Sequence, residues 1–132
     1  MRAYIDSNIF IYYALRHREL FEPCKRILGD IVNGRLDAFT SVLALTEVYH
    51  VISKETERDK AERAINAILS LPIEVKDIFV STFLLAMRRS ENLQVFDSIH
   101  LTIAEEYQAD CVITNDSDLE KGNLEVVRPI DY

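Results

Sequence analysis

The chain has 132 residues, and 48% of them are hydrophobic, which is enough for one compact domain over residues 1–132 with its own core. The net charge of −7 argues against a protein that coats nucleic acid non-specifically, because such proteins are usually basic. Cys24 and Cys111 form no Cys-x-x-Cys pair, so we expect two reduced core thiols in a cytoplasmic protein. No signal-peptide pattern is present, and no apolar run approaches the roughly 20 residues of a membrane span, so no membrane contact is expected.

Hydrophobic periodicity predicts short strands that alternate with helices along the whole chain. Strands are expected at residues 2–5, 36–39, 73–75, 111–114 and 124–127. Helices are expected at about residues 8–14, 19–32, 41–54, 58–70, 77–89 and 97–108. This alternation predicts an α/β fold of three layers, in which a mostly parallel sheet of four to five short strands has helices on both faces. Within the helix at 77–89, we expect four side chains to face inward: Phe79, Phe83, Ala86 and Met87.

Four acidic residues stand in segments that carry no Lys or Arg: Asp6, Glu47, Asp97 and Asp116. Asp6 and Asp116 follow predicted strands, and the other two lie early in predicted helices. Because ligands of such folds bind outside the carboxyl ends of the strands, we expect the four to meet at one rim. A charge near a core is costly unless it is paired, and clustered carboxylates are typical ligands of hard divalent cations such as Mg²⁺.

Each of these residues also has a simpler interpretation when it is taken alone. An Asp that follows a strand is often only a helix cap, and Glu47 could be a solvated residue on a helix face. Their combination in a strand–helix context favours a metal site. Phosphate-binding glycine loops and a Gly-x-Ser-x-Gly elbow are absent from the sequence, which opposes the corresponding nucleotide-binding and serine-hydrolase folds.

The histidines suggest an alternative metal centre. Glu47-x-x-His50 and Asp97-x-x-His100 match the carboxylate-x-x-His spacing of di-iron helix bundles. Such a bundle needs four long helices and two more inward Glu residues, and the predicted strands oppose it. We therefore expect His50 and His100 to be surface or partly buried polar residues.

Four motifs, in this order along the chain, resemble those of the PIN domain, a small α/β nuclease fold. The segments are Tyr4-Ile5-Asp6-Ser7-Asn8-Ile9-Phe10, Thr46-Glu47-Val48, Phe96-Asp97-Ser98-Ile99-His100-Leu101 and Val112-Ile113-Thr114-Asn115-Asp116-Ser117-Asp118-Leu119. The chain is most similar to the toxin ribonucleases of VapBC-type toxin–antitoxin modules, and the resemblance covers essentially its whole length. Ser7 replaces the usual Thr and keeps the hydroxyl, and Leu119 stands where an aromatic residue is common.

The resemblance implies cleavage of RNA with one or two Mg²⁺ or Mn²⁺ ions as cofactors. Asp6, Asp97 and Asp116 would be metal ligands, and Glu47 would be a fourth ligand or would orient the attacking water. Asp118 competes with Asp116 for its role.

Neighbouring side chains would hold these carboxylates in place. Ser7, Asn8 and Thr114 are the candidates through hydrogen bonds, and Asp118 is expected beside the ligands if it is not one itself.

Contacts with RNA need local positive charge, and two basic clusters offer it. Arg16 and Arg18 follow the first predicted helix, and Arg88 and Arg89 end the helix that leads towards Asp97. A basic loop that contacts only solvent would account for the same residues.

The resemblance also implies partners, namely a homodimer and an antitoxin protein. Apolar positions in the helices at 41–70 and in the first two helices exceed what one core face needs, and this surface could pack either partner. The alternatives are an inactive PIN-type binding module and a nuclease within an RNA-processing assembly.

Overall fold

A computed structural model describes residues 1–132, and it confirms every predicted strand and helix with small shifts of their ends. The strands are β1 (Arg2–Ile5), β2 (Asp37–Ser41), β3 (Glu74–Lys76), β4 (Cys111–Ile113) and β5 (Glu125–Val127). The α-helices are α1 (Ser7–Ala14), α2 (Phe21–Val32), α3 (Val42–Glu55), α4 (Arg58–Leu69), α5 (Val80–Arg88) and α6 (Val95–Glu106). Two short 3₁₀ helices are η1 (Ser117–Lys121) and η2 (Pro129–Asp131). None of the helices combines the length and the apolar character that crossing a membrane requires.

All five strands are parallel, in the order β3-β2-β1-β4-β5. Strand β1 is central, and Ala3 pairs with Ala38 of β2 on one side and with Cys111 of β4 on the other. From β1 the chain builds the sheet first towards β3 and later towards β5, so the strand order reverses between β1 and β4. In open α/β sheets, the crevice at the carboxyl ends of such strands is where ligands bind.

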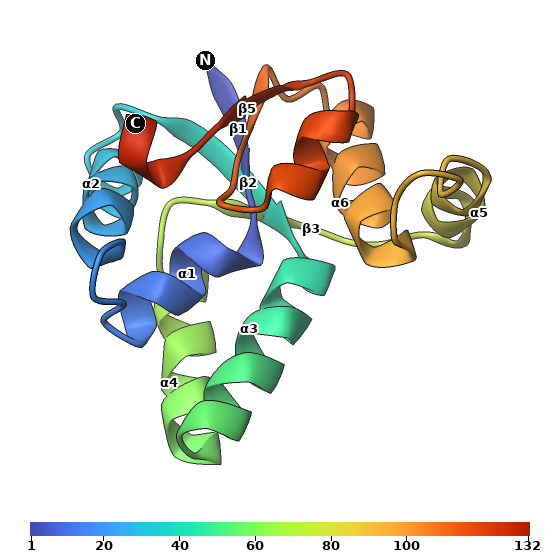
Figure 1. The fold of residues 1–132 in the computed structure, drawn as a ribbon. Helices are drawn as coiled ribbons and strands as arrows, with labels where there is room; N and C mark the ends of the chain where they lie inside the picture. Colours follow the sequence, from blue (N-terminus) through green and yellow to red (C-terminus); the bar gives the residue numbers. More distant parts are fainter.

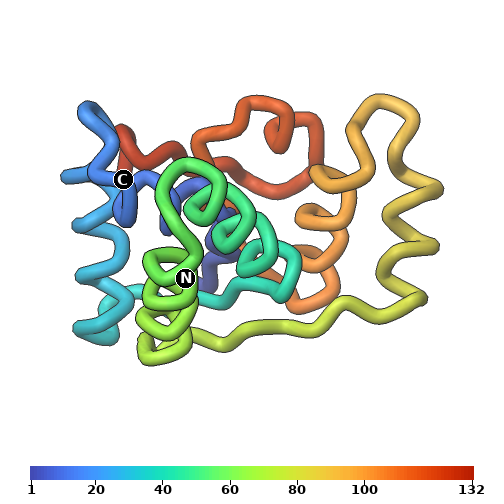
Figure 2. The backbone as a smooth tube through the Cα atoms, turned by 90° about the horizontal axis from the view of Figure 1, so that it is seen from below, coloured from blue at the N-terminus to red at the C-terminus, as the bar shows by residue number.

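Alternate residues of the central strands feed two separate cores, as a sheet covered on both faces requires. Ala3 and Ile5 pack with helices α1 to α4, whereas Tyr4 packs with α6 and η1 on the opposite face. Figure 1 shows this three-layer arrangement, and Figure 2 shows the α3–α4 pair between α2 and α6 when the molecule is seen from below. The expected α/β fold is therefore confirmed.

Helix α5 lies outside these layers and packs mainly against α6 (Figures 1 and 2). The prediction that Phe79, Phe83 and Met87 face inward is wrong, because these side chains are 55%, 40% and 51% exposed. The buried residues of α5 are Thr82 and Ala86, one turn apart, and they form the narrow stripe that meets α6. Six of the nine residues of this helix are apolar, so periodicity does not identify the side that faces inward.

Candidate metal centre

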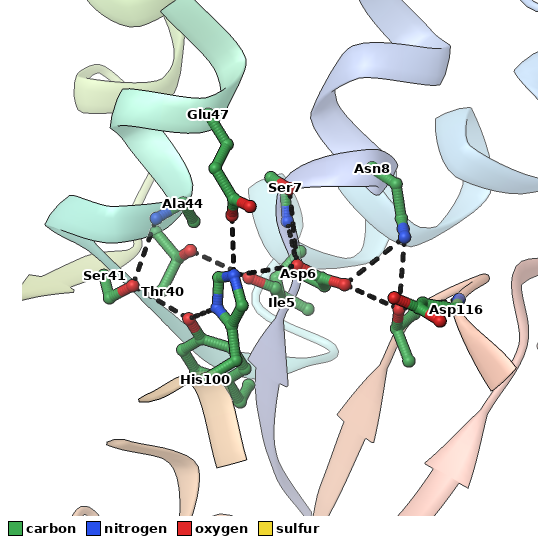
Figure 3. A network of polar contacts seen from close by, with 12 residues as sticks. Ile5, Asp6, Ser7, Asn8, Thr40, Ser41, Ala44, Glu47, His100 and Asp116 are labelled. Atoms are coloured by element: carbon green, nitrogen blue, oxygen red, sulfur yellow. Dashed lines mark hydrogen bonds and ion pairs between the residues drawn. The ribbon is translucent and has the colours of Figure 1, made fainter. Parts of the chain in front are cut away.

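Asp6 is buried at the carboxyl end of β1, where it is the N-cap of α1. Its Oδ1 accepts a hydrogen bond from the Ser7 amide at 2.7 Å, and its Oδ2 accepts one from the Thr114 hydroxyl at 2.7 Å. The Asn8 amide group adds a longer contact of 3.3 Å to Oδ2. Asp6 is thus both a helix cap and a carboxylate fixed by three neighbours (Figure 3).

Thr114 and Asn8 connect this carboxylate to Asp116. The Thr114 hydroxyl oxygen accepts a hydrogen bond from the Asp116 amide at 3.0 Å, and the Asn8 side chain donates to the same oxygen at 3.1 Å. Asn8 Oδ1 in turn accepts a hydrogen bond from the Asn115 amide at 3.2 Å. These contacts lock the ends of β1 and β4 together at the point where the strand order reverses.

Asp116 also caps η1, because its Oδ1 accepts a hydrogen bond from the Asp118 amide at 2.9 Å. Carboxylate oxygens of Asp97, Asp116 and Asp118 all lie within 4.8 Å of one another. Burial and the charge of Asp116 raise the pKa of Asp97 to about 6, and Asp118 and Asp6 add to this effect while His100 opposes it. Three acids this close, two of them without any ion pair, leave negative charge that a cation can neutralise.

Glu47 extends from α3 to the other side of Asp6, where it pairs with His100. Its Oε1 lies 2.6 Å from His100 Nε2, which also lies 3.6 Å from Asp6 Oδ1. The expectation that His100 is at the surface or only partly buried is wrong, since this residue is 3% exposed. His50, one turn after Glu47, is exposed as expected.

Two groups of ligand atoms therefore adjoin at the carboxyl ends of β1 and β4. One group is Asp6, Glu47 and His100, and the other is Asp97, Asp116 and Asp118. No Lys or Arg forms an ion pair with the four predicted ligands. A set dominated by carboxylate oxygens and lacking basic partners fits a hard divalent cation such as Mg²⁺ or Mn²⁺.

Comparison with known families matches residues 3–123 to the PIN domain. The chain belongs to the PIN-domain family. The five-stranded sheet of this PIN domain also rules out the di-iron helix bundle that the carboxylate-x-x-His spacing suggested. Comparison with curated proteins finds no matching relative.

Solved structures share the fold of this PIN domain at low sequence identity. Mycobacterium tuberculosis VapC20, a toxin that cleaves the sarcin-ricin loop, is 12% identical with a TM-score of 0.77, and the match covers 92% of this chain and 95% of that chain. A toxin–antitoxin complex from Klebsiella pneumoniae is 19% identical with a TM-score of 0.69, covering 98% and 99%. DNA-bound VapBC from Salmonella typhimurium is 14% identical with a TM-score of 0.72, covering 98% of each chain.

The arginines predicted to contact RNA lie in different parts of the PIN domain. Arg16 lies beyond the far end of α1 from the metal centre and stacks 5.3 Å over the Phe21 ring. Arg18 and Arg88 are exposed and form no ion pair, whereas Arg89 is paired with Glu105 at 2.7 Å. Their role in RNA binding stays a prediction, and Arg89 is the least available of the four.

His100 is the residue of this site that the sequence analysis missed. It follows Asp97 by three positions on α6, so both side chains occupy the same side of the helix. That spacing is visible in the sequence. It pointed to the wrong partner, because His100 contacts Glu47 from a different helix and not the acid of its own motif.

Proposed function

We propose that this PIN domain is a Mg²⁺- or Mn²⁺-dependent endoribonuclease and the toxin of a toxin–antitoxin pair. The observation that carries the proposal is the cluster of acidic side chains at the strand-order reversal, with no Lys or Arg to neutralise it. The fold of VapC toxins and the motif resemblance support RNA as the substrate.

Each acidic residue has a definable task in phosphodiester hydrolysis. A bound divalent ion would lower the pKa of a water ligand and stabilise charge on the attacking and leaving oxygens. Asp6, Asp97 and Asp116 would hold the ion, with Asp6 fixed by Ser7 and Thr114 so that its geometry does not change during turnover. Glu47, one-third exposed, would orient the water from the side opposite Asp116.

The test compares two aspartates that differ in their place on the fold. Asp97→Asn should abolish Mn²⁺-dependent cleavage of RNA, because it removes a charged ligand and adds an amide of nearly the same shape. Asp59→Asn is the matched control, since Asp59 is exposed on α4 and has no partner. Cleavage by Asp97→Asn at the wild-type rate would reject the site. Activity of the wild-type protein that EDTA does not reduce would reject it as well.

A groove at the far end of α1 from the metal centre would suit an antitoxin segment. This groove, of about 840 Å³, lies between α1, α2, α3 and α4, and apolar residues such as Phe10, Leu28 and Ile68 line it. Four basic residues at its edge form no ion pair: Arg16, Lys25, Lys60 and Arg63. An amphipathic segment with acidic residues fits this chemistry. The structural neighbours include toxin–antitoxin complexes, which supports such a partner.

Helix α5 offers a surface for a second copy of the chain. Clustered large apolar residues are normally buried or part of an interface, yet Val80 is 78% exposed and seven neighbouring large apolar residues are exposed as well. The eight are Phe79, Val80, Phe83, Leu84, Leu85, Met87, Val95 and Phe96. A standard interface buries about 800 Å² per partner, and two such helices packed about a two-fold axis would cover each other's apolar side.

Two other functions share the same fold. A PIN domain could bind RNA without cutting it, but all four acidic positions are occupied by acids. It could instead work inside an RNA-processing assembly. A short neighbouring gene that encodes a DNA-binding motif would support the antitoxin pair, and its absence would favour the assembly.

A further inference from the structure

A buried chain of hydrogen bonds ends at Glu47. The hydroxyl oxygens of Ser41 and Tyr4 lie 2.8 Å apart, and the Tyr4 hydroxyl lies 2.6 Å from His100 Nδ1. The other ring nitrogen, His100 Nε2, lies 2.6 Å from Glu47 Oε1. Figure 3 shows Glu47 beside one ring nitrogen of His100 and Ser41 beyond the other. Residues from β2, β1 and α6 thus form a linear chain that ends at one carboxylate oxygen on α3.

The direction of the hydrogen bonds follows from the first member. Ser41 is the N-cap of α3, and its oxygen accepts a hydrogen bond from the Ala44 amide at 3.2 Å. The Tyr4 oxygen is the one acceptor that contacts the Ser41 hydroxyl, so Ser41 donates to Tyr4 and the Tyr4 hydroxyl donates to His100 Nδ1. The network therefore assigns the ring proton to Nε2, where it points at Glu47.

We propose that His100 is a positioning residue, which fixes Glu47 Oε1 and leaves Oε2 as the one oxygen of Glu47 that acts in the metal centre. This proposal rests on the ribonuclease function proposed above. Glu47 lies on a helix face and is one-third exposed, so without His100 its side chain would be free to occupy several rotamers. The Tyr4–Ser41 pair orients His100, and both hydroxyls are fully buried.

A role for His100 as a metal ligand is the competing arrangement, since ligand atoms of Asp6, Glu47 and His100 lie within 4.8 Å. A ligand needs an unprotonated nitrogen. Both the assigned tautomer and the imidazolium carry a proton on Nε2. The remaining tautomer carries its proton on Nδ1. It would place the lone pair of Nε2 against a lone pair of Glu47 Oε1, with the two atoms 2.6 Å apart, and would leave the Ser41 hydroxyl without an acceptor.

Two substitutions separate these roles. The Gln amide in His100→Gln can reach the place of Nε2 and donate to Glu47, whereas the Asn amide in His100→Asn reaches only the place of Nδ1. We expect His100→Asn to lower kcat about 10–100-fold, as loss of outer-shell partners commonly does, and His100→Gln to recover most of it. Mn²⁺ affinity, measured by calorimetry, should change little in either variant. The exposed His50→Asn is the matched control.

Wild-type kcat in His100→Asn would overturn the proposal. Mn²⁺ affinity that collapses in both variants would also overturn it, because that result marks a ligand.

A second measurement needs neither activity nor a substitution at His100. In ¹⁵N-labelled wild-type protein at fixed pH, Nε2 should carry a proton whose resonance moves in Glu47→Ala and persists when Mg²⁺ is added. Loss of that proton on adding Mg²⁺ would reject the positioning role. A wild-type protein without ribonuclease activity would reject the proposed function and leave this second readout intact.

Discussion

Asp6 and Asp97 carry the same carboxylate group in opposite surroundings. Asp6 accepts hydrogen bonds from Ser7, Thr114 and Asn8. Asp97 accepts none from another side chain, and burial with nearby acids raises its pKa to about 6. Asp6→Asn should therefore lower the free energy of unfolding by about 1–3 kcal/mol. The NH₂ group of Asn would replace one of the two accepting oxygens, and the donor that faces it would lose its acceptor. Asp97→Asn should leave the protein equally or more stable.

Thermal denaturation of both variants in EDTA measures this difference. Both should be inactive, so activity alone cannot distinguish the two environments. A Tm for Asp97→Asn that falls as far as that of Asp6→Asn would contradict the view that Asp97 is held against repulsion from Asp116 and Asp118.

The raised pKa of Asp97 makes metal binding depend on pH. Between about pH 4 and pH 6 the folded protein keeps a proton on Asp97 that the unfolded chain has lost, so the metal-free fold loses stability as pH rises through this range. A cation must displace that proton. The rise in Tm caused by Mn²⁺ should therefore be small at pH 5 and larger at pH 7, and Asp97→Asn should remove most of this dependence. A Tm shift of equal size at both pH values would contradict the assignment.

The sequence indicated these acids because each breaks an apolar segment, and a charge in such a place needs a physical reason. It could not indicate His100 in the same way. A single His on a helix is compatible with solvent, with a core hydrogen bond or with a metal, and its contact with Glu47 depends on how α3 and α6 approach each other across the sheet. Long-range packing of this kind is absent from local spacing.

Among the elements, α5 shows where periodicity stops being informative. Strands β1 and β4 were predicted well because short apolar runs followed by polar residues allow few alternatives. In α5 the apolar residues surround the helix, so no stripe identifies the side that meets α6. The side that does so carries Thr82 and Ala86, because small side chains allow the two helices to approach closely and Thr82 donates to Glu106.

The exposed side of α5 predicts self-association. Leu84 is 47% exposed and lies on the side of the helix away from Thr82. Leu84→Glu would place a charge in the middle of the proposed interface, where its desolvation is unfavourable. We expect the wild-type protein to have about twice the 15.2 kDa mass of one chain in light scattering at micromolar concentration, and the variant to have the mass of one chain.

A matched control is Leu69→Glu at the end of α4, where the side chain is 56% exposed and the helix lies apart from α5 (Figures 1 and 2). This variant should keep the wild-type mass. A wild-type protein of 15.2 kDa, or a dimer that Leu84→Glu leaves intact, would show that α5 is not the contact between copies.

At the scale of the whole molecule, the proposed function requires an acidic protein to bind a polyanion. The net charge is −7, so attraction for RNA has to come from the metal centre and from a few well-placed arginines. The packing of α5 against α6 brings the end of α5 close to the centre: the Ser98 hydroxyl, next to Asp97, donates to the Ala86 carbonyl at 2.7 Å. Arg88 follows two residues later and is free of ion pairs, whereas Arg16 lies at the far end of α1, beside the groove proposed for an antitoxin segment.

This placement predicts which arginine contacts RNA. Arg88→Ala should weaken RNA binding and lower the slope of log affinity against log salt concentration by about 1, as the loss of one phosphate contact does. The double variant Arg16→Ala, Arg18→Ala should leave the slope unchanged if its arginines serve the groove. Affinities would be measured from low to moderate salt in Ca²⁺, provided that Ca²⁺ suppresses cleavage. A slope that changes only in the double variant would assign the substrate path to the α1 side, and the acidic centre would then be approached across α1 and not from the end of α5.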